Sequence, residues 1–435
     1  MLTLLVAVLM AGCRRDRGAD VEELFRCVPN TSSWVVVADL RSIIEKSGSK
    51  IDGDKVEAGA ELQKALSQAS DRKAAEAFKS MLNGDSGIEP SVAVAFADGF
   101  NNYVVGNLSS TSRFQEFVTK NDGGEWKEQD GVRYNGAYAV TENRFWMRAG
   151  GLQVNPDKIK EYLALSERQS FAGSDFAPML KDTDCDMAGW CDINGAMNTA
   201  GVNFQQRAMI KMVSEAMFKD AGFAVFDMQF DKGAVNIEGR LLDSKGKDAK
   251  YLLPSRKIDE KVLERIGGKA DGLLAMAVPQ KLIKQVKDMV SGKVSMIGMA
   301  VNAMGCVDGT AAFAFTNHGQ AVTGVVQTTG EGTADLMSLL QSMGMTVSKE
   351  NKDLLVSQGN MDGSEDVAAM GAMLKGCSMG VVVNTDTFNP TFAPDAAAVK
   401  DMVIKMVPKS GSMVLEVQIR AKNPDSNFIV SMLGA

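Results

Sequence analysis

Three aspartates at alternate positions, Asp182, Asp184 and Asp186, have the spacing that opens many calcium-binding loops. Carboxylate oxygens are ligands that Ca²⁺ prefers, and D-x-D-x-D is the first half of an EF-hand loop. Such a loop also requires glycine at its sixth position and glutamate at its twelfth. This chain has Met187 and Ile193 at those positions. The pattern therefore favours a charged turn leading into a strand whose alternate residues face water.

Other catalytic chemistry has few candidate residues in this sequence. His318 is the one histidine, so a Ser-His-Asp or Cys-His mechanism would have to use it. It lies in the string TNHGQ, which is typical of a hairpin turn. Trp190 beside Asp192 could form a sugar-stacking platform, although an aromatic residue on a strand is usually a core residue. We therefore predict no catalytic residue, no metal site and no cofactor.

Five cysteines follow Cys13 in the chain, and their spacing indicates no metal site or redox motif. They are Cys27, Cys185, Cys191, Cys306 and Cys377. None forms a C-x-x-C pair, and their odd number leaves at least one unpaired. Cys185 and Cys191 would lie about 20 Å apart on one extended strand, which is beyond disulfide reach. We predict buried free thiols.

The N-terminal residues 2–12, LTLLVAVLMAG, form an uninterrupted apolar run that ends at Cys13. A membrane-spanning helix needs about 20 apolar residues, whereas the apolar region of a signal peptide has about 7–15. The string Leu9-Met10-Ala11-Gly12-Cys13 resembles the lipobox of bacterial lipoproteins. That resemblance implies cleavage between Gly12 and Cys13, with acyl chains such as palmitate attached to Cys13.

The lipobox predicts a signal peptide over residues 1–12 and an anchor tether over 13–23. It places the protein in the bacterial cell envelope, most readily at the outer membrane, and leaves the membrane face open. The alternative is that residues 1–12 form a buried first strand or helix and that Cys13 is a core thiol.

Composition limits the classes of partner. Hydrophobic residues make up 45% of the 435 residues and charged residues 23%, as in ordinary globular proteins. The length suggests two or three domains. The net charge is −7, so no broad positive field is expected and nucleic acid is not a predicted partner.

An internal repeat gives the strongest evidence about the architecture. Residues 24–44 align without a gap on 263–283, and both read as a turn, an apolar strand and the start of a helix. Helical patterns follow at 55–82 and 280–303. Three further pairs of segments come in the same order: the hairpins 92–108 and 311–327, the segments 180–194 and 374–386, and the strands 233–243 and 412–422.

These matches predict a duplicated α+β protein. The first copy spans 24–245, a linker spans 246–261, and the second copy spans 262–435. Alternating strands joined by tight turns imply antiparallel sheet, so each copy is expected to be an antiparallel sheet packed with helices.

Three longer segments resemble a known group of proteins. They are VPNTSSWVVVADLRSIIEKSG (28–48), AYAVTENRFWMRAG (137–150) and SFAGSDFAPMLKDTDCDMAGWCDI (170–193). Together with the lipobox, they resemble uncharacterised lipoproteins of Bacteroides-type bacteria, which are classed as a domain of unknown function. The resemblance implies an envelope lipoprotein with duplicated α+β domains and carries no activity.

We therefore expect an envelope lipoprotein that binds a protein or polymer partner, such as a polysaccharide, without catalysis. Its other partner is the membrane, through the lipid anchor. One alternative is structural or folding support in the envelope, which predicts a broad apolar concave surface. The other is a carboxylate-based glycan hydrolase, which predicts acids and an aromatic residue in one cleft between the two copies.

Overall fold

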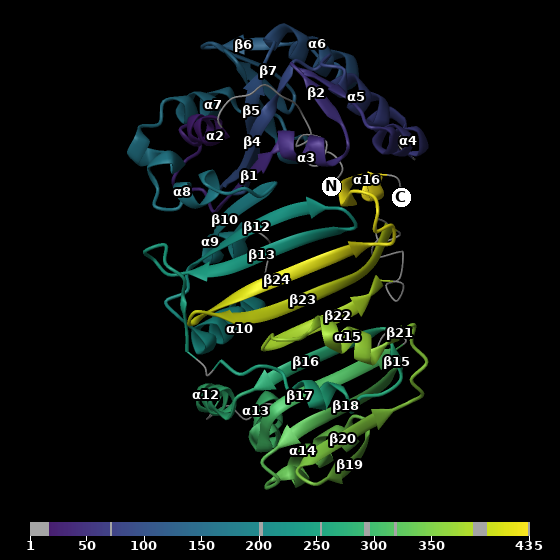
Figure 1. The fold of residues 1–435 in the computed structure, drawn as a ribbon. Coiled ribbons are helices and arrows are strands. Elements are labelled where there is room, and N and C mark those ends of the chain that lie inside the picture. Colours follow the sequence, from purple (N-terminus) through teal and green to yellow (C-terminus); the bar gives the residue numbers. More distant parts are fainter. Residues whose placement is uncertain are drawn as a thin grey trace.

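In the computed structural model, most strands belong to one antiparallel sheet, which runs from one end of the molecule to the other (Figure 1). The structure describes residues 17–69, 72–199, 203–252, 255–290, 296–316, 320–385 and 398–433. Within them the sheet has 18 strands. Helices cover parts of both faces, which confirms the α+β fold predicted from the sequence.

The sheet can be followed by hydrogen-bonded neighbours from the first half of the chain to the second. Its strands in spatial order are β6 (Lys127–Gln129), β7 (Val132–Asn135), β8 (Tyr138–Thr141), β9 (Arg144–Arg148), β5 (Asn101–Leu108), β4 (Ile88–Asp98), β1 (Trp34–Asp39), β10 (Met187–Asp192), β12 (Phe223–Asp231), β13 (Ala234–Leu242), β24 (Ser412–Ala421), β23 (Val399–Lys409), β22 (Met379–Asn384), β16 (Gly272–Val278), β17 (Val307–Thr316), β18 (Ala321–Thr328), β20 (Asp353–Gln358) and β19 (Thr346–Glu350).

The two halves of the sheet have the same order of pairing. In the first half the order is β9, β5, β4, β1, β10, β12, β13, and in the second it is β20, β18, β17, β16, β22, β23, β24. The last strands of the two halves, β13 and β24, pair with each other, so that Glu238 lies directly opposite Glu416. This pairing gives each strand a hydrogen-bonding partner where it would otherwise present an open sheet edge.

Tight turns fix the register of the hairpins on either side of this junction. The turn between β23 and β24 is Ser410-Gly411, and both residues have positive φ angles, 48° and 86°. Such a turn matches the right-handed twist of the strands that it joins. The turn between β12 and β13, Lys232-Gly233, also has two residues, so the two hairpins can be compared position by position.

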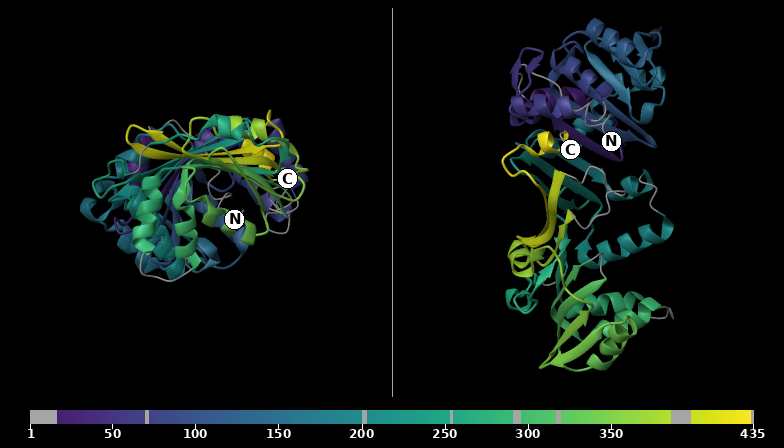
Figure 2. Two further views of the ribbon diagram at one scale, coloured as in Figure 1. Left: turned by 90° about the horizontal axis from the view of Figure 1, so that it is seen from below. Right: turned by 90° about the vertical axis from the view of Figure 1, so that its right-hand side faces the viewer.

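Helices pack on both faces at each end of the sheet and leave its middle strands less covered (Figure 2). In the first half, α2 (Arg17–Phe25), α7 (Pro156–Leu163) and α8 (Ala177–Lys181) pack on one face, and α3 (Leu40–Lys46), α4 (Ala60–Gln68), α5 (Arg72–Leu82) and α6 (Thr111–Asp122) pack on the other. In the second half, α11 (Glu260–Leu263) and α15 (Val367–Met373) continue the first of these layers, and α12 (Gln280–Val290), α13 (Met296–Ala303) and α14 (Thr333–Ser342) continue the second.

The remaining elements lie outside the main sheet or at its margins. They are α9 (Ile193–Thr199), α10 (Phe204–Met217), α16 (Phe428–Leu433), the 3-10 helices η1 (Ala149–Gly151), η2 (Glu167–Gln169), η3 (Phe171–Gly173) and η4 (Met304–Cys306), and the two-stranded ribbons β2 (Lys50–Asp52) with β3 (Lys55–Glu57), β11 (Phe218–Lys219) with β14 (Lys250–Tyr251), and β15 (Lys269–Ala270) with β21 (Glu365–Asp366).

The hairpins predicted at 92–108 and 311–327 are confirmed, and three other segments differ in part from what the sequence predicts. The segment 55–82, which the sequence predicts to be helical, begins with strand β3 of the β2–β3 hairpin and becomes helical only at Ala60. The tether predicted over 13–23 is helix α2 from Arg17 onward, and its Val21 and Leu24 are buried in the core. The predicted linker 246–261 contains β14 and the fully buried Ala249, because this segment packs beside β24.

Candidate functional site

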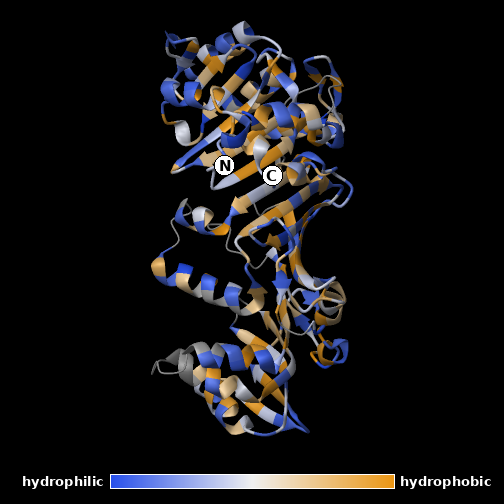
Figure 3. Ribbon diagram, turned by 90° about the vertical axis from the view of Figure 1, so that its left-hand side faces the viewer, coloured by the Kyte–Doolittle hydropathy of each residue, from blue (hydrophilic) through white to orange (hydrophobic). Residues whose placement is uncertain are grey.

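The middle of the sheet has two chemically different faces, because residues alternate between faces along each strand. The strands concerned are β12, β13, β24 and β23, which we call the central strands. One row across them consists of Asp227, Glu238, Glu416 and Lys405. The adjacent row on the opposite face consists of Met228, Ile237, Val417 and Ile404. Figure 3 shows this alternation of polar and apolar residues along the strands.

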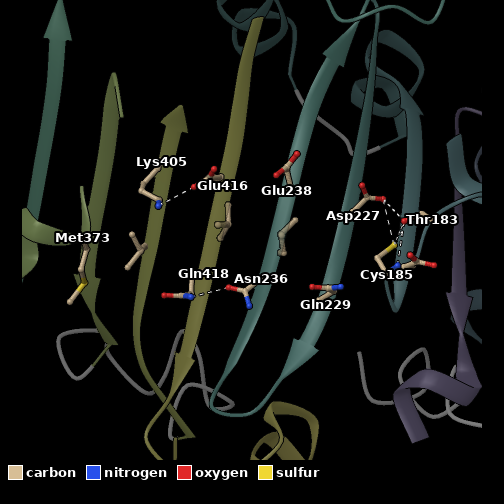
Figure 4. A pocket seen from close by; sticks show the side chains of 14 residues that line it. Thr183, Cys185, Asp227, Gln229, Asn236, Glu238, Met373, Lys405, Glu416 and Gln418 are labelled. Atoms are coloured by element: carbon tan, nitrogen blue, oxygen red, sulfur yellow. Dashed lines mark hydrogen bonds and ion pairs between the residues drawn. The ribbon is translucent and has the colours of Figure 1, made fainter. Parts of the chain in front are cut away.

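The polar face forms an open groove with a cavity volume of about 710 Å³ (Figure 4). We call it the polar groove. The central strands form its floor, the loop before β10 lies at one side and α15 contributes Met373 at the other. The residues that line it are Thr183, Asp184, Cys185, Asp227, Gln229, Asn236, Glu238, Met373, Val403, Lys405, Glu416 and Gln418. Ile237 and Val417, whose positions along their strands belong to the opposite face, also border the cavity. A volume of this size is within the range of small-molecule and peptide sites.

Lysines neutralise the acids at the β23 end of the polar groove. Lys405 Nζ lies 3.0 Å from Glu416 Oε2, while Lys409 Nζ lies 3.0 Å from Glu238 Oε2 and 3.4 Å from Glu416 Oε1. Burial acts to raise the pKa of Glu416, but the hydrogen bond and the charge of Lys405 outweigh it and hold that pKa below its usual value. Glu416 is therefore ionised at neutral pH and is poorly suited to act as a general acid.

The β12 end of the groove has no comparable neutralisation. Asp227 Oδ1 accepts weak hydrogen bonds from the Thr183 hydroxyl at 3.4 Å and the Cys185 thiol at 3.5 Å. Among the described residues, no lysine or arginine lies within ion-pair distance of Asp227. The polar groove therefore has a neutralised end and an acidic end.

Amide side chains form a second polar row beside the charged one. Gln229, Asn236 and Gln418 lie on successive strands, and Gln418 Nε2 donates to Asn236 Oδ1 at 2.9 Å. Each amide carries both donors and acceptors, so this row can hydrogen-bond to peptide groups or hydroxyls. None of the described lining residues is aromatic.

The opposite face of the central strands is apolar and only partly covered. We call it the apolar face and define it as Phe226, Met228, Ile237, Gly239, Leu415, Val417, Ile404 and Met406. Each of these residues is at least partly exposed, and Leu415 has 42% of its surface exposed. The same rows continue through Val381 and Met379 of β22 to Leu274 and Met276 of β16.

Other elements cover only the margins of the apolar face. Phe428 of α16 packs near Met228 and Ile237, and the β11–β14 ribbon packs near Met406. Helix α10 contacts α12 and β11 and stands away from the central strands (Figure 2). Its Phe204 and Ile210 are 84% and 41% exposed. Contiguous half-exposed apolar residues of this kind mark interaction surfaces more often than single exposed ones do.

The three aspartates of the D-x-D-x-D motif do not converge. Asp182 and Asp184 are exposed, whereas Asp186 is fully buried and forms an ion pair with Lys46, with Nζ at 2.8 Å. Among the described residues, no three side chains of His, Cys, Asp or Glu come together in a way that could hold a metal ion. The charged-turn interpretation describes Asp182 and Asp184, and Asp186 belongs to the packing of the first half.

Trp190 and Asp192 do not form a sugar platform. Trp190 is 5% exposed and lies against the rings of Phe171, Phe176 and Phe223. Its neighbour Asp192 accepts a hydrogen bond from the backbone N–H of Asn194 at the start of α9. Trp190 is a core residue because alternation turns it toward the helix-covered face of β10.

The cysteines within the described residues are free thiols, as the sequence predicted. Cys27, Cys185, Cys306 and Cys377 are buried, and Cys191 is partly exposed. Burial raises the pKa of Cys377 to about 11, so that this thiol stays protonated and unreactive at neutral pH.

Three residues singled out from the sequence lie outside the described residues. They are Gly12 and Cys13 of the lipobox and His318. Within the described part of the chain, no helix is both long and apolar enough to cross a membrane.

Sequence reasoning missed the residues that line the polar groove. Their signal was the period-two pattern of β12, in which Asp227, Gln229 and Asp231 alternate with apolar residues. That alternation predicts a strand with one wet face. It does not show that the wet faces of four strands from opposite halves of the chain lie side by side.

Comparison with known proteins finds solved structures with a similar arrangement of the chain. No protein-family model matches the chain, and no curated protein matches its sequence. Crystal form I of TP0453 is similar with a TM-score of 0.32 and 8% identity, over 80% of this chain and 95% of that one. Crystal form III gives 0.31 and 8%, over 80% and 96%, and form IV gives 0.30 and 10%, over 50% and 79%.

Proposed function

We propose that this protein is a lipoprotein of the bacterial envelope that binds a protein partner on its apolar face without catalysis. In this proposal, cleavage between Gly12 and Cys13 removes the signal peptide, and lipid on Cys13 anchors the chain. The two halves, 24–245 and 262–435, are copies of one unit. The lipobox resemblance supports the anchor, and the shared order of strand pairing supports the duplication.

The observation that carries the binding proposal is the contrast between the two faces of the central strands. Where helices leave these strands uncovered, the face that forms the polar groove carries Asp227, Glu238 and Lys405, as expected of a surface in water. The other face is just as open to solvent at Leu415 and yet is apolar throughout. Burying a large aliphatic side chain contributes about 1.5–3 kcal/mol, so a partner that covered several of them would bind with useful affinity.

The chemistry of the apolar face favours a protein segment with an apolar stripe. Met228 and Met406 flank its aliphatic centre, and methionine side chains adapt their shape to different partners. The backbone groups of the central strands are already paired within the sheet, so the surface offers packing without hydrogen bonds. An amphipathic helix, whose own backbone groups are satisfied, is the simplest protein element that fits such a surface.

The polar groove supports the alternative of a glycan hydrolase less well than the apolar face supports binding of a protein. Glu238 and Glu416 are held in ion pairs with lysines, and the described lining has no aromatic residue on which a sugar could stack. The folding-support alternative predicts a broad apolar surface and differs from our proposal only in the kind of client. We propose binding of a folded or folding-competent helix.

We expect Leu415→Glu to weaken binding of an uncharged amphipathic leucine–glutamine helix at least about tenfold, because it places a charge in the centre of the apolar face. The measurement is fluorescence anisotropy of the labelled peptide. The matched control is Gln418→Glu, which adds the same charge to the same strand on the opposite face and should leave affinity unchanged. Equal affinity of Leu415→Glu and the parent would contradict the proposal. If the peptide does not bind the parent protein, the proposal is also contradicted, whether or not the protein binds neutral phosphatidylcholine vesicles.

Growth with radioactive palmitate should label the parent protein, and Cys13→Ala should abolish the label, because the Cys13 thiol is the side chain of the lipobox to which the lipid is attached. The mutant should also leave the membrane fraction. Cys191→Ser serves as the control, since Cys191 is the partly exposed thiol of the described chain and should not affect labelling. Label that persists in Cys13→Ala would show that the lipobox interpretation is wrong.

A further inference from the structure

We infer that helix α10 is a lid, which turns about its C-terminal end and covers the apolar face when no partner is bound. This regulatory role rests on the proposed function of the apolar face, whereas the closing movement itself does not. In the structure, α10 projects from the sheet instead of lying along it (Figure 2).

Two sets of contacts place α10 on the same side of the sheet as the apolar face. Its last residue, Met217, packs in one cluster with Met406 and Met413. Met406 belongs to the apolar face, and Met413 lies two residues before Leu415 on β24, so that alternation directs it to the same side. Helix α10 also contacts α12, which packs in the layer over Met276, where the apolar rows continue.

One face of α10 begins a contact with this side of the sheet and leaves it incomplete. Ile210 precedes Met217 by seven residues, which is about two helical turns, so the two side chains lie on the same face of the helix. Met217 is partly buried in its cluster, whereas Ile210 is 41% exposed. Lys211 and Glu215 form an exposed ion pair on a different face of the helix. A turn of α10 toward the strands would therefore bury Ile210 and leave the charged pair in water.

The ends of α10 allow the helix to move as a unit. Its N-terminus is closed by its own residues, because Asn203 Oδ1 accepts from the backbone nitrogen of Gln206 at 2.9 Å and Gln206 Oε1 accepts from that of Asn203 at 3.2 Å. At the other end the chain becomes extended at Phe218, with φ of −130° and ψ of 144°. Phe218 is buried and pairs with Tyr251 of β14, so it provides a fixed pivot.

The base of this arm is fixed to the sheet, and the arm is long enough to close. The backbone nitrogen of Ile193, just after β10, donates to the oxygen of Gly222, just before β12, at 3.0 Å. The backbone nitrogen of Gly222 donates in turn to the oxygen of Leu242 at 3.0 Å. The 14 residues of α10 extend about 21 Å at 1.5 Å per residue. Three strand spacings separate the outermost central strands by about 14 Å. A closed α10 can therefore cross the apolar face without any change in the sheet.

A lid of this kind would compete with the proposed partner for one surface. Both are helices with an apolar stripe, but α10 is tethered and so has an effective concentration in the millimolar range, as for short linkers. A partner binds only the open fraction of the molecules, so its apparent affinity falls by that fraction. The lid would exclude weakly bound apolar segments and admit a helix that makes more extensive contacts.

Disulfide trapping tests the closing movement directly, in the full chain with Cys191→Ser as background. Ile210→Cys and Leu415→Cys together should form an intramolecular disulfide under mild oxidation, because closure brings their Cα atoms within the roughly 7 Å that a disulfide can bridge. The matched control combines Ile210→Cys with Gln418→Cys, which lies on the same strand but on the opposite face and should form no such bond. Non-reducing electrophoresis and peptide mass mapping identify the linked residues.

Three results of this experiment would overturn the lid. The first is the absence of an intramolecular bond between positions 210 and 415. The second is an equal yield with Gln418→Cys. The third is a bond that joins two chains, because the apolar face would then receive α10 of a second copy.

A second variant measures the competition with a partner. Ile210→Ser removes the side chain that closure buries, so the uncharged leucine–glutamine helix should bind it at least about threefold more tightly than it binds the parent. Lys211→Ser is the matched control, since Lys211 is exposed on another face of α10 and its replacement should leave the affinity unchanged. Parental affinity of Ile210→Ser would overturn the lid.

The two experiments separate failure of the lid from failure of the proposed function, because the disulfide needs no peptide. If the disulfide forms and the peptide does not bind the parent, closure is supported and the proposed function is wrong. If the peptide binds and no disulfide forms, the lid is wrong and the proposed function is unaffected.

Discussion

Replacement of Asp186 by alanine is expected to lower the free energy of unfolding by about 3 kcal/mol, because it breaks a buried, charge-assisted network. The Asp186 carboxylate is fully buried and lies 2.8 Å from Lys46 Nζ and 2.6 Å from the backbone nitrogen of Phe230. It also accepts a hydrogen bond from the Ser42 hydroxyl. The variant removes the acceptor of these donors, and Lys46 keeps only partial access to water and a longer ion pair with Asp231 at 3.8 Å.

Urea denaturation followed by circular dichroism measures this loss, provided that the slope with denaturant stays unchanged. Asp184→Ala is the matched control, since Asp184 is an exposed aspartate of the same motif and its loss should change stability by less than about 0.5 kcal/mol. Equal effects of the two variants would mean that the buried network contributes nothing. The pair also separates the packing role of Asp186 from a calcium-binding role, in which all three aspartates would matter.

Replacement of Trp146 by alanine is expected to lower the free energy of unfolding by about 4 kcal/mol, within the range for large buried aromatic residues. Trp146 is fully buried, and its indole stacks on Tyr162 with ring centres 5.9 Å apart. Its Nε1 donates to the Thr141 hydroxyl at 3.1 Å. The variant creates a cavity in the core of the first half and leaves that hydroxyl without a partner.

Thermal and urea unfolding of Trp146→Ala should therefore show a lower midpoint than the parent. Phe100→Ala is the control, because Phe100 occupies the β4–β5 turn with 86% of its surface exposed and should be neutral within about 0.5 kcal/mol. A parental midpoint for Trp146→Ala would contradict the core assignment. If unfolding becomes biphasic instead, the midpoint that falls should belong to the first half of the chain.

The two faces of the central strands differ in chemistry, one carrying charged and amide side chains and the other apolar side chains. Their separation follows from alternation, because a residue on one face of a strand cannot reach the other face. A substitution in the polar groove, such as one at Asp227, should therefore leave apolar binding intact.

Much of the local structure could be predicted from the sequence. The hairpins at 92–108 and 311–327 follow from apolar runs separated by short polar turns, and both are present. The burial of Cys27 and Cys377 follows from their apolar surroundings. These features depend on neighbours within a few residues, which the sequence displays directly.

Predictions that depended on longer segments were less successful. The pattern at 55–82 suits a helix, but Gly53 has a φ of 63° in the turn that joins β2 to β3, so that residues 55–57 form a strand. Residues 17–23 read as a charged tether because Arg17 and Asp20 break the apolar pattern. In the structure, Arg17 forms an ion pair with Asp39 and the helix packs on the core.

By itself, the sequence determined the class of the fold, the alternation of its strands and the positions of its tight turns. Only the tertiary structure decided that β13 pairs with β24, which brings Glu238 opposite Glu416 although 178 positions of chain separate them (416 − 238). It also decided which parts of the sheet the helices leave uncovered. Alternation records only that a strand has a polar and an apolar side. Whether each side meets water, a helix or a partner depends on contacts between distant segments, which no local pattern contains.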